Sequence, residues 1–123
     1  MSFQKVDNWL KNQNEDGIAE DYVFMLKSEL SEVQNSAGFT EELRKHKALG
    51  NKIRYSIYKY MEQKELCTCV LSKLFDIKEA TISHHLKILK DAGLIVGVTK
   101  GLYTVYYTKE KMIESLNQSS ALF

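Results

Sequence analysis

The chain has 123 residues, and a composition of 44% hydrophobic and 27% charged residues is typical of one globular domain of ordinary size. It contains no run of 18 apolar residues, and residues 1–10 lack the basic-then-apolar pattern of a secretory signal, so we expect no membrane partner and a cytoplasmic location. The net charge of +1 is unevenly distributed: residues 1–40 carry −4 and residues 41–111 carry +6, which favours a polyanionic partner.

The first part of the chain predicts two helices. Apolar residues recur at helical spacing within residues 3–10 and again at about residues 18–34, with a polar break between the two stretches. We therefore expect residues 1–39 to form a helical extension, followed by a main domain at residues 40–123.

The sequence of residues 40–123 predicts a closely spaced series of elements. Asn51 is placed to cap one helix, because its side chain can accept hydrogen bonds from the first free backbone N–H groups. Residues 66–75 predict a short helix with Val70, Leu71 and Leu74 directed toward the core.

The rest of the domain predicts a helix, a hairpin and a final helix. Gly93 is placed to end the longer helix, and Lys100-Gly101 forms a turn between two β-rich runs. The fold class predicted by this order is mainly α with a β-hairpin wing, a winged helix-turn-helix. In chain order these elements are a tight turn at 76–78, a helix at 79–92, strands at 94–99 and 102–108, and a helix at 109–118.

The helix after the tight turn has two faces of different chemistry. Ile82, Leu86 and Leu89 fall on one apolar stripe, with His85 beside it as a packed histidine. The opposite face carries short polar side chains, one histidine and lysines, which can bond base edges or neutralise phosphates. With a lysine at the hairpin turn, the candidate DNA-binding residues are Ala80, Thr81, Ser83, His84, Lys87, Lys90 and Lys100.

The sequence of residues 46–108 resembles the ArsR/SmtB family of small metalloregulators, through the stretches HKALGNKIRYSIYKYM, ELCTCVLSKLF, EATISHHLKILKDAGLI and GLYTVYYT. The resemblance implies a homodimer built on terminal helices, in which residues 1–39 form an arm associated with the dimer and the last helix dimerises. It also implies repression by binding an inverted-repeat operator in double-stranded DNA. Metal or metalloid binding then releases the DNA.

The only cysteines are Cys67 and Cys69, and the resemblance implies that both are metal ligands. Thiolates are soft ligands, so the candidate effectors are As(III), with arsenite first, and Cd(II), Pb(II), Zn(II) or Cu(I), none of them required for the fold. Side chains two residues apart point about 200° apart on a helix, so the sulfurs can converge only where the segment is not regular helix.

The sequence departs from the family pattern in its ligand set. Ser72 stands where the arsenite-sensing pattern has a third cysteine, and the N-terminal extension has no cysteine. A two-thiolate site completed by a small thiol or solvent, a site shared across the dimer, and two core cysteines without metal all remain open. A regulator of the same fold that responds to thiol oxidation or a non-metal input is the alternative function.

Two further classes of protein are weighed against a regulator. A winged helix that serves only as a protein-interaction module would share the fold without binding DNA. An enzyme is not expected, because the sequence has no Gly-rich phosphate loop, no metal-plus-carboxylate cluster and no cysteine near a histidine.

Overall fold

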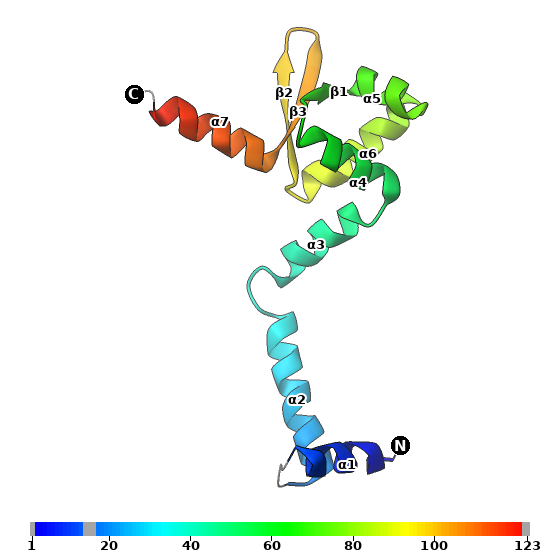
Figure 1. Ribbon diagram of the computed structural model, residues 1–123, viewed down its shortest axis with the longest axis vertical. Helices are drawn as coiled ribbons and strands as arrows, with labels where there is room; N and C mark the ends of the chain where they lie inside the picture. Colours follow the sequence, from blue (N-terminus) through cyan, green and yellow to red (C-terminus); the bar gives the residue numbers. More distant parts are fainter. Residues whose placement is uncertain (1, 14–16, 122–123) are drawn as a thin grey trace. The chain divides into compact units, whose positions relative to one another are not determined.

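The computed structural model describes residues 2–13 and 17–121, and the chain divides into two compact units, Met1–Thr40 and Glu41–Phe123 (Figure 1). In the part of the chain so described, no helix is both long enough and apolar enough to cross a membrane.

The first unit is a pair of helices, α1 (Gln4–Asn12) and α2 (Ala19–Gln34), as the helical spacing predicted. Leu10 is buried, and the rings of Trp9 and Tyr22 lie with their centroids 5.9 Å apart. These contacts join α1 to the first turns of α2. Most of α2 remains uncovered, and its exposed apolar side chains include Phe24, Met25, Leu30 and Val33.

The remainder of the chain contains five helices and three strands, and its helix, turn, helix and hairpin follow the predicted order (Figure 1). The strands form one antiparallel sheet in the order β1-β3-β2, with Leu66 opposite Tyr106 and Ile95 opposite Thr108. The elements are α3 (Phe39–Leu49), α4 (Lys52–Met61), β1 (Leu66–Cys67), α5 (Thr68–Phe75), α6 (Glu79–Asp91), β2 (Ile95–Lys100), β3 (Tyr103–Thr108) and α7 (Lys109–Ala121).

Local signals in the sequence set the ends of two helices. The side-chain oxygen of Asn51 accepts hydrogen bonds from the backbone N–H groups of Ile53 and Arg54, at 3.0 and 3.1 Å, so it caps α4 as predicted. Gly93 has φ +77°, a conformation that glycine adopts without a steric penalty, and the N–H of the following residue donates to the carbonyl of Leu89 at 3.0 Å. This Gly-terminated end turns the chain from α6 into the hairpin.

The first helix of the helix-turn-helix pair is shorter than predicted, and two of its inward assignments are wrong. Leu66 and Cys67 form β1 instead of a helical turn, because they pair with β3. Leu71 is fully buried as predicted, but Val70 and Leu74 are 46% and 52% exposed. An eight-residue helix that enters the core through Leu71 leaves both flanking side chains outside the packed layer.

Candidate nucleic-acid interface and thiol site

The apolar stripe of α6 holds the helix on the core of the second unit. Ile82 and Leu89 are fully buried and Leu86 is 1% exposed, as the helical period predicted. They pack with side chains of α4 and α5, including Ile57 and Leu71. The position of α6 is therefore fixed by burial of one face, which leaves the other face to solvent.

His85 is packed beside this stripe, which confirms the prediction, and it has a specific partner. A guanidinium nitrogen of Arg54 lies 3.3 Å from Nδ1 of His85, and Nε of Arg54 donates to the carbonyl of Ala48 at 2.6 Å. Because a guanidinium only donates, Nδ1 must accept, so the neutral ring carries its proton on Nε2. Burial, followed by the positive charge of Arg54, lowers the pKa of His85. Arg54 thus ties the end of α3 to α6.

The predicted DNA-binding side chains of α6 lie on its solvent face. Lys87 pairs with Asp91 at 3.5 Å, one turn along the helix, but both side chains are well exposed, so the pair is weak. A phosphate can therefore compete for this lysine. The predicted residues that are exposed on α6 are Ala80, Thr81, Ser83, His84, Lys87 and Lys90.

The remaining predicted residue, Lys100, lies at the end of β2 beside the hairpin turn. Its ammonium group donates to the hydroxyl of Tyr107 and lies 5.2 Å from the centre of that ring. The hydrogen bond to Tyr107 raises the pKa of Lys100, so the side chain stays cationic. Sequence reasoning did not identify Tyr107 as the partner, although strand alternation places it on the same face as Lys100.

The two cysteines lie where a strand becomes a helix. Cys67 is extended, with φ −97° and ψ 163°, and occupies the cap position of α5, whereas Cys69 is in the first turn of that helix. Both thiols are free. Because Cys67 is not helical, both cysteines line one hollow between α5 and the hairpin, and a hydrogen bond from Cys69 to Cys67 shifts the pKa values of the two thiols in opposite directions. The extended backbone of Cys67 means that the two side chains are not separated by the 200° that two such positions on one regular helix would impose.

The pKa values of the two thiols are shifted in opposite directions. The bond from Cys69, followed by the backbone N–H of Val70, lowers the pKa of Cys67. The same bond raises the pKa of Cys69, which must keep its proton in order to donate it. Cys67 is therefore the more readily ionised thiol and the stronger nucleophile at neutral pH.

We expect iodoacetamide to alkylate Cys67 before Cys69 at pH 7 to 8, because a lowered pKa raises the thiolate fraction. The pH midpoint for alkylation should lie below the usual thiol value of about 8.5 for Cys67 and above it for Cys69. Time-resolved peptide mass spectrometry measures both rates. Cys69→Ala should slow the reaction of Cys67, whereas Cys69→Ser keeps a hydroxyl donor and should restore it; faster alkylation of Cys69 would contradict the assignment.

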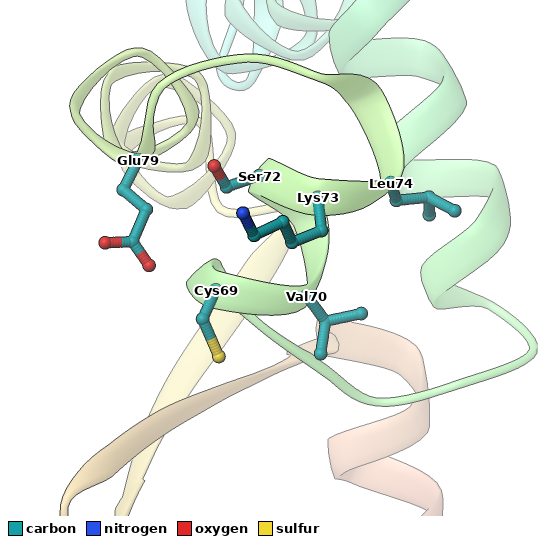
Figure 2. A pocket seen from close by; sticks show the side chains of 6 residues that line it. All are labelled: Cys69, Val70, Ser72, Lys73, Leu74 and Glu79. Atoms are coloured by element: carbon teal, nitrogen blue, oxygen red, sulfur yellow. The ribbon is translucent and has the colours of Figure 1, made fainter.

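Cys69 adjoins a groove of about 830 Å³ beside α5 (Figure 2). Cys69 and Lys73 line it from α5, and Glu79, the first residue of α6, lines it from the other side. The proximity of Glu79 to Cys69 has no local signal in the sequence, since it depends on how the two helices pack. Among residues 2–13 and 17–121, no group of three or more His, Cys, Asp or Glu side chains is arranged to hold a metal ion.

Ser72, which lines the groove, links α5 to the turn before α6. The hydroxyl of Ser72 on α5 donates to the carbonyl of Ile77 in the turn before α6. Asp76 adopts the left-handed conformation in this turn, with φ 54°, and ends α5. Ser72 is thus engaged in holding the turn, while the two thiols lie at the opposite, N-terminal end of α5.

The order of the elements defines a winged helix-turn-helix protein. A solved domain from Mycobacterium bovis, described as a homodimeric winged helix-turn-helix DNA-binding domain, has the same fold with a TM-score of 0.56 at 23% identity. The match covers 68% of this chain and 77% of that one. The predicted fold class is therefore confirmed.

Sequence relatives place the chain within this class. Residues 51–96 match the family described as bacterial regulatory protein, arsR family. The arsenical resistance operon repressor of Bacillus subtilis is 35% identical over 59% of this chain and 70% of its own length. The cadmium resistance transcriptional regulatory protein CadC of Listeria innocua is 31% identical over 86% of this chain and 87% of its own length. The chain belongs to the ArsR family; it is a DNA-binding transcriptional regulator and not an enzyme.

Proposed function

We propose that the protein is a transcriptional repressor that leaves its operator when a thiophilic metal or metalloid binds Cys67 and Cys69. The observation that carries the proposal is that both thiols are free and lie at the start of α5, the helix that packs against α6. Trivalent arsenic is the first candidate effector, because an arsenical resistance operon repressor is among the relatives. Free thiols also fit a reducing cytoplasm.

The DNA-binding half of the proposal rests on the exposed face of α6 and on the wing. Short polar side chains such as Ser83 and His84 are suited to base edges, whereas Lys87, Lys90 and Lys100 are suited to phosphates. A helix of about 10–12 Å diameter fits the major groove. The basic charge of residues 41–111 supports the same partner.

We propose a homodimer that reads an inverted repeat. The relative from Mycobacterium bovis is described as homodimeric. Exposed apolar side chains on the terminal helices, including Leu30 and Val33 on α2 and Ile113 and Leu116 on α7, are suited to covering by a second copy. A two-fold dimer presents two copies of α6, so duplexes selected by this protein should carry two related half-sites in inverted orientation.

The proposed coupling runs from the thiols in two directions. Cys67 lies in β1, which pairs with β3 of the wing, and Cys69 lies in α5, which is tied to the turn before α6. A ligand that bridges the sulfurs changes the angle between β1 and α5. The wing is paired with β1 and α6 is tied to α5, so the bound and free forms can differ in affinity for the operator.

The test uses a duplex selected from a random-sequence pool by the protein itself, with binding followed by fluorescence anisotropy. As(III), Sb(III), Cd(II), Pb(II), Zn(II) and Cu(I) are added in turn, and at least one should weaken binding by about 5- to 150-fold. The variant with Cys67→Ser and Cys69→Ser should bind the duplex as the wild type does and lose this response. Unchanged affinity with all six ions, or a response that survives in the serine variant, would show that the thiols are not the effector site.

A second candidate function is a response to oxidants, favoured by the lowered pKa of Cys67 and the adjacent thiol. In that case DNA release requires an oxidant and no metal ion. Mass spectrometry of the released protein should then show a Cys67–Cys69 linkage, or a persulfide where the oxidant is itself a donor of sulfane sulfur. Release by a metal ion under reducing conditions favours the first candidate.

A further inference from the structure

The outer face of α6 begins with a carboxylate. Glu79 is the first residue of the helix, and its side chain is exposed. Ser83, one of the predicted DNA-binding residues, follows it by one helical turn and is exposed on the same face. The carboxylate projects outward from the first turn of α6 (Figure 2). Glu79 therefore lies within the surface that we propose to bind DNA.

Glu79 also lies on the side of α6 that faces the wing. It lines a hollow of about 280 Å³ together with Leu102, Tyr103 and Thr104 of the hairpin. Because α6 and the wing border the same hollow, a duplex that contacts both elements passes close to this carboxylate.

Glu79 has no charged partner in the free protein. None of the ion pairs within residues 2–13 and 17–121 includes it, whereas Asp91 at the other end of α6 pairs with Lys87 at 3.5 Å. The start of a helix favours a nearby negative charge, so Glu79 is stable there as the ionised form. Both of its oxygens are thus available to a hydrogen-bond donor on a ligand.

The chemistry of a carboxylate limits what it can contact on DNA. An ionised carboxylate only accepts hydrogen bonds, and a phosphate repels it. It therefore binds favourably only where a base edge donates. In the major groove guanine presents two acceptors, thymine presents an acceptor and a methyl group, and the N6 donor of adenine lies beside the N7 acceptor. Cytosine presents its N4 donor, so it is the base that suits a glutamate.

We infer that Glu79 reads a cytosine in each half-site of the operator, by accepting a hydrogen bond from the N4 amino group. This inference rests on the DNA-binding half of the proposed function and not on the thiols. In helix-turn-helix proteins the N-terminal residues of the second helix contact base edges, and Glu79 holds that position in α6. A wrong base leaves the carboxylate without a donor or facing an acceptor, so Glu79 also rejects the other bases.

The test selects duplexes from a random-sequence pool with the wild type, Glu79→Gln and Glu79→Ala. The wild type should select a cytosine at one position of each half-site. Glu79→Gln should select adenine there, because glutamine pairs with N6 and N7 of adenine, and Glu79→Ala should lose its preference at that position alone. In anisotropy titrations, replacing the cytosine in one half-site should weaken wild-type binding by about 5- to 150-fold and Glu79→Ala binding by less than about twofold.

Glu41→Gln on α3 is the matched control, since it removes the same charge beside the opposite, C-terminal end of α6. This variant should select the wild-type motif. Circular dichroism shows whether each variant is folded, so a changed motif reports on base contacts and not on unfolding.

The outcomes separate this inference from the proposed function. If Glu79→Gln selects the same base as the wild type at every position, the inference is wrong and the proposed function stands. If Glu79→Ala gains affinity equally for all duplexes, with a steeper salt dependence, the carboxylate only repels phosphates and the inference is again wrong. If the wild type selects no motif from the pool, the DNA-binding half of the proposed function fails as well.

Discussion

Replacing Leu86 with alanine should lower the free energy of unfolding by about 2–5 kcal/mol, the usual cost of truncating a buried leucine. Leu86 is 1% exposed and packs with Ile82 and Leu89, which join α6 to the core. Because single domains unfold with only about 5–15 kcal/mol, the loss is a large share of the total. Urea unfolding followed by circular dichroism measures the change as a lower midpoint with an unchanged slope.

The control for this prediction is the next residue along the helix. Lys87 is exposed, and its replacement by alanine should change stability by less than about 0.5 kcal/mol. Leu86→Ala should therefore lower the free energy of unfolding several-fold more than Lys87→Ala does. A Leu86→Ala variant as stable as Lys87→Ala would mean that the apolar face of α6 does not anchor the helix in solution.

The same Lys87→Ala variant should lose about 10- to 100-fold in affinity for the selected duplex at 0.1 M salt. The reason is that each lysine on a phosphate releases counterions, and a dimer loses two such contacts. The slope of the logarithm of affinity against the logarithm of salt concentration should fall in magnitude by about two. Anisotropy titrations at several salt concentrations give both values.

Lys5→Ala on α1 makes the same change in net charge outside the second unit and is the matched control. It should leave the salt slope unchanged. Equal losses of affinity in the two variants would show that overall charge, and not a contact made by α6, governs binding to DNA.

The sequence predicted the bounds and the buried face of α6 well because their determinants are local. The spacing of Ile82, Leu86 and Leu89 fixes which face is buried, and Gly93 fixes where the helix ends. The packed position of His85 followed from the same geometry. Its partner Arg54, on another helix, did not follow, since the sequence gives no distance between α4 and α6.

The geometry of the thiol site depends on contacts between distant segments, which local sequence patterns do not specify. The resemblance to the family singled out Cys67 and Cys69, and helix geometry gave the condition for their convergence. Whether that condition holds depends on β1, a two-residue strand that exists only because β3 pairs with it. The nearby exposure of Val70 and Leu74 likewise depends on how α5 packs.

The sequence by itself determined the class of protein, the order of its elements, the buried face of α6 and the two thiols, because helical periods, turn residues and motif spacing act over a few positions. Only the tertiary structure decided that Cys67 is extended and that a hollow lies beside both cysteines. These features require a strand near residue 67 to pair with one near residue 105, and the physical cause is a hydrogen-bonded ladder between segments far apart in the chain.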